Sequence, residues 1–386
     1  MQGQTDTGLA PMREPRPPLH SLTGLRFFAA SGVVVYHFAT AWLPPGPLKN
    51  VAASGFVGVD LFFLLSGFVL SYVYRPWDGI APRPYLAARV ARILPLYVTS
   101  LVLAAPFYFS GLVERRGPLG GAARALLSTV LHLSMTHAWV GHTGVWNVPD
   151  WSLSCEWAFY LALPAVAPRL LRTRRPLRLA VVVLAAGLAP AFAYHAWRPN
   201  FVGAGAFDPS PLAGLLVFHP AFRVHEFLVG ALLGRAWTLD STRYYVRGST
   251  AVATALLFLI FANSTGLPYI PFSNGLLIPL WALLLAGLAA GRDPIARFLA
   301  TRPLVVLGDA SYAIYILHVP LFAWVSRLIK YSGAALPPAV AFTLYFASLI
   351  GASIAAFHLV EAPLRSLIRT RVETWLTPHP ERSREP

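Results

Sequence analysis

The sequence contains a single cysteine, Cys155, in 386 residues. One cysteine cannot form an internal disulfide, and it excludes the paired-cysteine motifs of structural zinc sites. Charged residues are also scarce, at 12% of the chain against about 25% in an average soluble domain. Acidic residues are the rarer kind, with 16 Asp and Glu against 31 Lys and Arg. This shortage of charge excludes an ordinary water-soluble domain.

Long hydrophobic runs fill the sequence instead. Hydrophobic residues make up 56% of the chain, and the mean hydropathy is +0.57. About 20 apolar residues suffice to cross a bilayer as a helix. Ten runs approach or reach this length, at 25–43, 55–74, 93–112, 152–170, 179–197, 212–234, 249–264, 274–290, 304–326 and 338–360. The sequence therefore predicts an all-α, polytopic membrane protein of about ten transmembrane helices.

An eleventh run, 124–140, is weaker because Arg124, His132 and other polar residues interrupt it. Without it as a span, the arginines within 75–92 and 169–178 fall on one side of the membrane, as the positive-inside rule requires. We therefore expect 124–140 to form an interfacial or re-entrant helix on the outer side. Eleven spans are the alternative.

Both termini then lie in the cytoplasm. Residues 1–20 are polar and proline-rich, without the apolar core of a signal peptide, so we expect a cytoplasmic tail there and another at 367–386. Residues 21–366 form the expected transmembrane domain. The net charge of +15 resides mainly in arginines at the ends of apolar runs, so we expect a lipid bilayer and no nucleic acid as partner. The sequence sets no oligomeric state.

The first apolar run carries two ionisable residues on one face. Arg26 and His37 are eleven residues apart, almost three helical turns. They therefore lie roughly 16 Å apart along the same side of a helix. Ionisable groups inside a bilayer cost on the order of 2.5–3.5 kcal/mol and normally line a cavity or pair with another group. We interpret this helix as the wall of a site.

The predicted topology brings further polar residues to the level of His37. Asp60, Glu156 and His318 belong to three other helices, and each falls in the outer half of the bilayer. Asp60 is either a structural hydrogen-bond acceptor or a carboxylate that orients His37 and fixes its tautomer. Four helices thus converge on one candidate site.

Glu156 belongs to a polar stripe. Ser152, Glu156 and Tyr160 recur every four residues after Trp151, so they share one face of a helix that is otherwise apolar. This pattern indicates a cavity lining, with polar contacts between helices as the alternative.

Two further patterns suggest ligand binding. Ser311, Tyr315 and His318 share a helix face, and we expect Tyr315 and His318 to bind a substrate. Arg89 and Arg92 lie on one turn at the inner end of the third run, where guanidinium groups can bind a phosphorylated ligand. Positive-inside bias alone is the alternative explanation of this arginine pair.

Arg223 and Glu226, one turn apart inside the sixth run, are expected to pair with each other. The remaining histidines have no carboxylate or histidine at zinc-ligand spacing, so we expect no metal site. They are His132, His137, His142, His195, His219, His225 and His358.

Several motifs, taken in order, resemble the acyltransferase-3 family of bacterial membrane O-acyltransferases. The resemblance runs from about Ser21 to Arg365. It is carried by the segment from Leu22 through Arg26 to His37, Gly58-Val59-Asp60-Leu61-Phe62-Phe63 with Ser66-Gly67-Phe68, Arg89 with Arg92, Trp151-Ser152-Leu153 with Glu156 and Phe159-Tyr160, Glu226-Phe227-Leu228 with Gly230, and Ser311-Tyr312 to His318.

The resemblance implies a chemistry and a location. Members move acetyl or another short acyl group from acyl-coenzyme A (acyl-CoA) to a hydroxyl of a sugar, a glycan or a secondary metabolite, in the bacterial cytoplasmic membrane. The family's essential arginine and histidine correspond to Arg26 and His37, and its coenzyme-associated arginines to Arg89 and Arg92. The opening of the first run and the Ala/Arg-rich composition also resemble actinomycete members that acylate macrolide sugars.

We predict direct transfer, with His37 as general base and Asp60 or Glu156 stabilising the imidazolium that forms. The coenzyme phosphates are expected on Arg26, Arg89 and Arg92. The acceptor is expected to contact Trp151, Ser152, Tyr160, Tyr315 and His318.

Two alternatives remain. The first is double displacement through an acyl-enzyme on His37 or on a serine such as Ser66. The second is a carrier or flippase whose buried His and Asp residues relay protons. The two halves of the sequence show no mirrored repeat of the kind common in transporters, which favours the enzyme.

Overall fold

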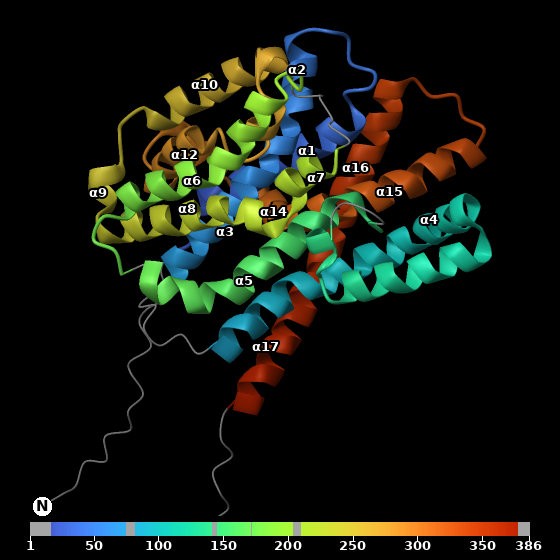
Figure 1. Ribbon diagram of the computed structural model, residues 1–386, viewed down its shortest axis with the longest axis horizontal. Helices are drawn as coiled ribbons and strands as arrows, with labels where there is room; N and C mark the ends of the chain where they lie inside the picture. Colours follow the sequence, from blue (N-terminus) through green and yellow to red (C-terminus); the bar gives the residue numbers. More distant parts are fainter. Residues whose placement is uncertain (1–16, 75–81, 141–144, 171, 204–209, 377–386) are drawn as a thin grey trace, which may run out of the picture.

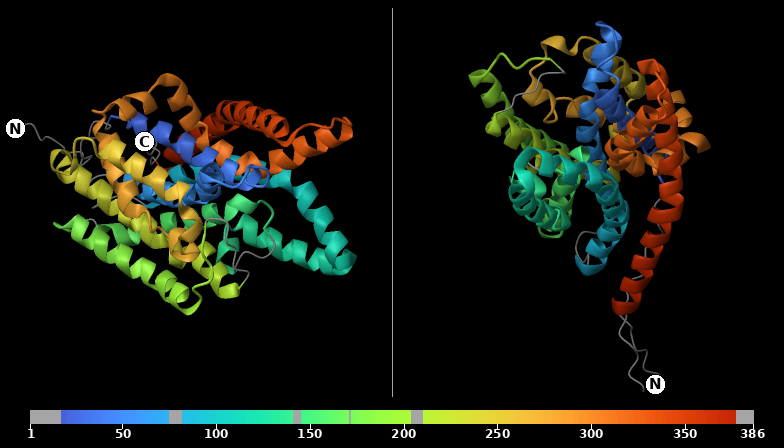
Figure 2. Two further views of the ribbon diagram at one scale, coloured as in Figure 1. Left: turned by 90° about the horizontal axis from the view of Figure 1, so that it is seen from above. Right: turned by 90° about the vertical axis from the view of Figure 1, so that its right-hand side faces the viewer.

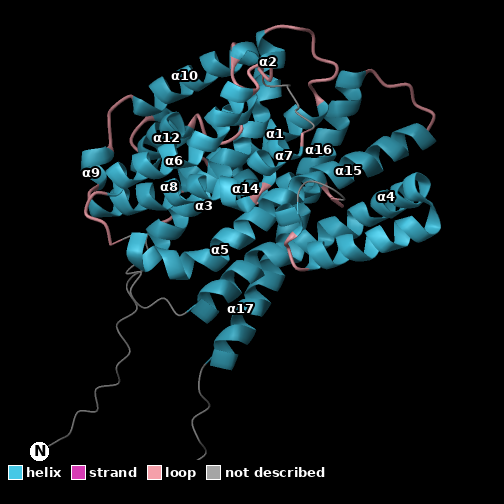
Figure 3. Cartoon of the chain, in the orientation of Figure 1, coloured by secondary structure: helices cyan, strands magenta, loops and turns pink. Residues whose placement is uncertain are grey.

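The computed structural model describes residues 17–74, 82–140, 145–170, 172–203 and 210–376. Within these ranges the chain consists of helices and their connections, with no β-strand (Figure 3). The extended pairing recorded there is one isolated bridge between Val202 and Pro268. The all-α prediction is confirmed.

The elements follow one another around a central bundle (Figure 1). They are α1 (His20–Phe38), α2 (Pro47–Ala53), η1 (Ser54–Val57), α3 (Gly58–Val73), α4 (Pro82–Leu133), η2 (His137–Val140), η3 (Val148–Asp150), α5 (Trp151–Leu170), α6 (Pro176–Trp197), α7 (Pro211–Phe218), α8 (Pro220–Leu239), α9 (Ser241–Tyr244), α10 (Ser249–Ala262), η4 (Ser264–Gly266), α11 (Tyr269–Phe272), α12 (Ile278–Ala290), α13 (Pro294–Leu299), α14 (Arg302–Asp309), α15 (Ser311–Tyr331), α16 (Pro338–Ala356), η5 (Phe357–Glu361) and α17 (Ala362–Leu376).

Among the described residues, six helical stretches are long and apolar enough to cross a membrane. They are Pro47–Val73, Pro82–Arg115, Pro176–Trp197, Pro211–Leu239, Ser311–Tyr331 and Pro338–Ile368. The expected count of ten is not confirmed. The runs 249–264 and 274–290 fold into helices of 14 and 13 residues, and the helices over 25–43 and 152–170 carry more polar residues than a simple span. The chain is a multipass membrane protein.

The weak run 124–140 belongs to a helical hairpin. Gly117, at φ 69° and ψ 173°, breaks the long α4 into two arms that meet at a turn (Figure 1). The second arm runs back beside the first, and the Tyr97 hydroxyl joins the two arms by donating to the His132 carbonyl at 2.9 Å. Helix ends at Leu133, and the rest of the run continues into η2.

Helices α3 and α8 touch through their backbones. Gly67 of α3 lies against the backbone of Phe227, and Gly230 of α8 lies against the carbonyl of Leu64. A side chain at either glycine would collide with the facing helix. Small residues thus permit the close packing of these two helices.

The C-terminal helices form a long column that extends away from the bundle at α17 (Figure 2). Between α16 and α17 the chain forms a π-helix, η5, over Phe357–Glu361. A π turn accommodates an extra residue and is frequent at functional sites. Here it ends at the buried carboxylate of Glu361, which faces α4.

Candidate active site

A cavity of about 1050 Å³ lies among α1, α3, α4, α5, α14, α15 and α17. Its lining includes seven of the eleven residues expected to take part in direct transfer: Arg26, Arg89, Arg92, Ser152, Glu156, Tyr160 and Tyr315. These residues come from four helices that are far apart in the chain. The cavity lining leaves out His37, Asp60, Trp151 and His318.

Arginines give the cavity its charge. Arg26, Arg89, Arg92 and Arg365 line it, against two acidic residues, Glu156 and Asp309. The guanidinium of Arg26 has no hydrogen bond or ion pair among the described residues. This excess of fixed positive charge suits the cavity to an anionic ligand.

The two arginines of α4 are held differently. Arg89 lies among the rings of Tyr74, Tyr85 and Tyr160, with its guanidinium carbon 5.7–6.0 Å from their centroids. Its Nη2 also approaches the Tyr74 hydroxyl at 3.5 Å. Aromatic faces stabilise a cation without neutralising it, so Arg89 keeps its charge available to a ligand.

Arg92 is tied to the C-terminal column. Its guanidinium forms an ion pair with the fully buried carboxylate of Glu361. The same carboxylate contacts Arg365 at 3.3 Å. Two arginines share one carboxylate, so this corner of the cavity keeps a net positive charge.

Glu156 is fixed by two hydroxyls. Ser66 of α3 donates to its Oε1 at 2.7 Å, and the Tyr160 hydroxyl donates to the same oxygen. Ser66 and Tyr160 also contact each other at 2.9 Å. The expected polar stripe of α5 is confirmed as a cavity lining, since Ser152, Glu156 and Tyr160 all belong to it.

Ser152 connects α5 to α15. Its hydroxyl lies 2.8 Å from that of Tyr315, and both hydroxyls also reach the Pro149 carbonyl. Trp151 faces elsewhere, because its ring packs against Phe218 and under the guanidinium of Arg223. The structure therefore places Ser152 and Tyr315 on the cavity wall and Trp151 behind it.

His37 contacts His318. The Nδ1 atom of His37 lies 3.1 Å from Nε2 of His318 and 2.9 Å from the Val33 carbonyl. The Nδ1 atom of His318 contacts the Tyr315 carbonyl. A carbonyl can only accept a hydrogen bond, so both Nδ1 atoms carry the proton. The Nε2 lone pair of His318 then faces His37, and the Nε2 lone pair of His37 is left for other chemistry.

Of the two interpretations of Asp60, the structure supports the structural hydrogen-bond acceptor and contradicts the pairing with His37. Asp60 accepts from Arg223 Nη2 at 2.7 Å and from the Gly275 amide at 3.2 Å. The reason is the close packing of α3 on α8, which turns Asp60 toward Arg223. The expected pair of Arg223 with Glu226 is confirmed at 3.0 Å. Asp60 therefore neutralises a buried arginine.

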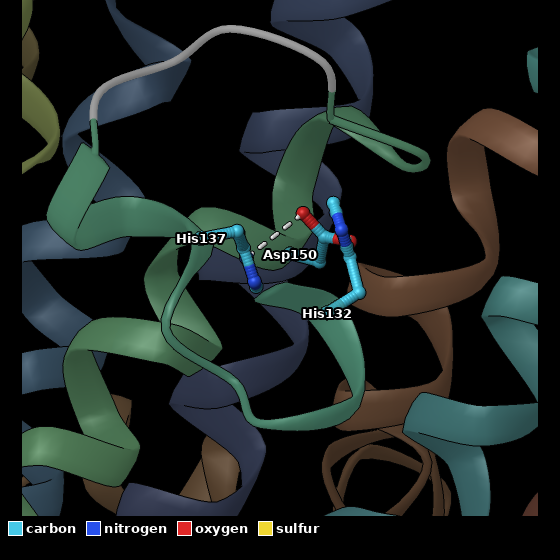
Figure 4. A group of neighbouring side chains, drawn as sticks. All are labelled: His132, His137 and Asp150. Atoms are coloured by element: carbon cyan, nitrogen blue, oxygen red, sulfur yellow. Dashed lines mark ion pairs between the residues drawn. The ribbon is translucent and has the colours of Figure 1, made fainter. Parts of the chain in front are cut away.

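One cluster was missed in the sequence. His132, His137 and Asp150 come together where α4 ends and α5 begins (Figure 4). Burial lowers the pKa of His137, but the Asp150 carboxylate outweighs it and the pKa is raised above its usual value. Helical spacing could not reveal this group, because Met135, at φ 55°, turns the chain between the two histidines.

These features define a class of protein: a multipass membrane protein whose helices surround a positively charged cavity beside a pair of contacting histidines. The family model described as an acyltransferase domain matches residues 19–358. The chain belongs to the acyltransferase-3 family, as the sequence motifs suggested.

Relatives of known name agree with this family. The chain is 31% identical over 325 residues to acyltransferase MdmB of Streptomyces mycarofaciens, a match that covers 80% of each protein. It is 24% identical over 383 residues to the peptidoglycan O-acetyltransferase OatA of Listeria monocytogenes, which covers 92% of this chain and 57% of that relative. O-acetyltransferase OatA of Staphylococcus aureus is also 24% identical, with 90% and 57% covered. No solved structure matches this chain.

Proposed function

We propose that the protein transfers a short acyl group from acyl-CoA to a hydroxyl of a sugar, a glycan or a glycosylated secondary metabolite. The observation that carries the proposal is the arginine-lined cavity, which α15 connects to the histidine pair. Along that helix Tyr312 contacts Arg92, Tyr315 lines the cavity, and His318 contacts His37. One helix thus connects the proposed donor site with the proposed base.

The donor is proposed to bind through its phosphates. Arg89 and Arg26 are the first candidates, because tyrosine rings surround Arg89 and Arg26 has no ion pair among the described residues. Arg92 contributes charge while it also holds Glu361. Hydrogen bonds to charged groups contribute about 1.5–3 kcal/mol each, enough to anchor a polyphosphate in a cavity of this size.

His37 is the proposed general base. The acceptor hydroxyl attacks the thioester carbonyl while Nε2 of His37 takes its proton, and the carbon–sulfur bond then breaks. The proton passes to the departing thiolate, which leaves as free coenzyme A. His318 stabilises the imidazolium by accepting from Nδ1 of His37, the part that had been expected of Asp60 or Glu156. General-base help of this kind is worth about 10²–10⁴ in rate.

The acceptor is proposed to lie against the wall formed by Ser152, Tyr160 and Tyr315, with Glu156 orienting its hydroxyl. The relatives named as O-acetyltransferases support a hydroxyl acceptor, and the Listeria relative is named for peptidoglycan. We propose the macrolide sugar as the first acceptor to test and a peptidoglycan fragment as the second.

The proposed setting is the bacterial cytoplasmic membrane with both termini in the cytoplasm. Residues 21–366 would form the transmembrane acyltransferase domain between tails at 1–20 and 367–386. In this orientation Arg26, Arg89 and Arg92 lie on the cytoplasmic side, where acyl-CoA is made.

Thiol release tests the proposal. Protein purified in lipid nanodiscs is given acetyl-CoA with a glycosylated macrolide, a peptidoglycan fragment or no acceptor, and free coenzyme A is measured together with the mass of the acceptor. We expect release that depends on an acceptor, with a product heavier by one acetyl group. No release with any acceptor, together with solute flux in proteoliposomes, would instead support the carrier. Acetyl groups retained on Ser66 or His37 would indicate an acyl-enzyme.

A further inference from the structure

Two histidines and an aspartate form a buried cluster outside the arginine-lined cavity. His132 lies in the last turn of α4, His137 opens η2, and Asp150 ends η3 (Figure 4). Their exposed fractions are 1%, 4% and 0%. Burying a carboxylate this completely is costly unless it is paired or bound to a metal. The proposed acyl transfer makes no use of this cluster.

The spacing of the three side chains fits a metal ion. Nε2 of His132 lies 3.4 Å from Oδ2 of Asp150, and Nε2 of His137 lies 3.3 Å from Oδ1. All three ligand atoms are within 4.8 Å of one another. Zinc bonds of about 2.0–2.1 Å in a tetrahedron separate neighbouring ligand atoms by about 3.3 Å. The two measured separations equal that edge in length, although they lead to different oxygens of Asp150 and the two imidazole rings are stacked with centroids 4.3 Å apart. One ring would therefore turn when an ion binds.

The cluster also contains unused hydrogen-bonding groups. Both carboxylate oxygens of Asp150 and both ring nitrogens of His137 lack a hydrogen-bond partner among the described residues. Buried polar side chains in proteins almost always have one. The His137 imidazole and the Asp150 carboxylate face each other at 3.3 Å without a hydrogen bond, and a cation between them would satisfy both.

His132 is oriented as a metal ligand. Its Nδ1 donates to the Ser128 carbonyl at 2.7 Å, so the proton is on Nδ1 and the Nε2 lone pair faces Asp150. Metal-binding histidines typically have such a carbonyl behind them. The Trp146 amide approaches the same Nε2 at 3.2 Å, and a bound ion would replace this contact.

We infer that His132, His137 and Asp150 form a zinc site. Imidazole and carboxylate ligands suit Zn²⁺, and three protein ligands leave a fourth position for water.

The ion would fasten the α4 hairpin to the loop that begins α5. That loop also holds α15, because Asn147 donates to the Ile316 carbonyl at 2.8 Å and Tyr315 donates to the Pro149 carbonyl at 3.1 Å. Zinc would therefore set the position of the Ser152 and Tyr315 wall from behind.

Metal content tests the site without any measurement of activity. The full chain in nanodiscs, freed of its affinity tag, is stripped with a chelator, titrated with Zn²⁺ or Co²⁺, and analysed by elemental mass spectrometry. We expect binding of about one ion per chain, with release of protons. Bound Co²⁺ should give the visible absorption of a tetrahedral site.

The matched variants are Asp150→Asn and His137→Gln, with His195→Gln as the control that removes a histidine elsewhere. Loss of a ligand should weaken affinity by more than the roughly 10–100-fold that outer-shell changes cost. The control should bind as the wild type does. Unchanged zinc content in both ligand variants would overturn the inference, as would folded wild type that binds neither ion.

X-ray absorption of the zinc-loaded wild type decides the matter if the ligand variants do not fold. Nitrogen and oxygen neighbours at about 2.0–2.1 Å, with imidazole scattering, support the assignment. A sulfur neighbour would contradict it, because the ion would then be bound at Cys155.

Discussion

Nε2 of His318 lies 3.1 Å from Nδ1 of His37, although the two histidines are 281 residues apart in the chain. Their rings are 4.9 Å apart between centroids, and His318 is completely buried whereas His37 is half-buried. The buried His318 therefore accepts a hydrogen bond from the more exposed His37. The role of each histidine can be tested separately.

His37→Ala should abolish transfer while the protein still binds the donor. The expected loss in kcat is at least about 10², the lower value of a general base. Thiol release measures kcat, and donor binding is measured by titration. Tyr36→Phe, on the same turn, is the control. More than about a tenth of wild-type kcat in the alanine variant would rule out the role of base.

His318→Leu should lower kcat with little change in the donor KM, because it removes the acceptor that faces Nδ1 of His37. The loss should be smaller than the 10²–10⁴ or so attributed to the base itself. His318→Gln should recover part of the activity, since its amide oxygen can accept the same hydrogen bond. Equal losses in both variants would indicate a packing role only.

Arg89→Ala should raise the KM for acyl-CoA about tenfold or more, the equivalent of one hydrogen bond to a charged group. The acceptor KM should change less. Arg92→Ala should raise the donor KM as well, but it should also lower the melting temperature, because Glu361 loses one of its two ion-pair partners. An unchanged donor KM in both variants would leave these arginines with a topological role.

Glu156→Gln should reduce kcat with little change in the donor KM. The amide keeps the size and most hydrogen bonds of the carboxylate. Any decrease in kcat is therefore due to the missing negative charge of Glu156. Glu114→Gln, which removes an exposed carboxylate from α4, is the control. Full activity of the Glu156 variant would mean that this residue only holds Ser66 and Tyr160 in place.

Asp60→Asn should destabilise the protein rather than impair catalysis alone. Asparagine keeps an acceptor for Arg223 but removes the negative charge that Asp60 supplies. Arg223 also keeps Glu226, so the loss should be smaller than the roughly 3–5 kcal/mol that a buried charge left without a partner costs. Thermal unfolding in nanodiscs measures the effect. A normal melting temperature with kcat reduced as far as in His37→Ala would restore the idea that Asp60 orients the base.

Local features of the site could be predicted from the sequence. The shared face of Ser152, Glu156 and Tyr160 and the pair of Arg223 with Glu226 follow from the helical repeat alone. The helical class follows from hydrophobicity. These inferences succeeded because they depend on residues three or four positions apart.

Contacts between distant helices could not be predicted. Asp60 faces Arg223 because glycines bring α3 and α8 into backbone contact, and no pattern within α3 reveals which helix lies opposite. The cluster of His132, His137 and Asp150 depends on the left-handed backbone of Met135. The span count depended on where helices end, which hydrophobicity does not record.

The π-helix over Phe357–Glu361 has a consequence for how the cavity tolerates change. Its extra residue sets the rotation of everything that follows, and removing one residue there would turn Glu361 and Arg365 by about 100° about the helix axis. Arg92 would then face a different side of α17. The C-terminal wall of the cavity is thus specified by the number of residues in that turn as much as by their identity, and it is more sensitive to a deletion than to most substitutions.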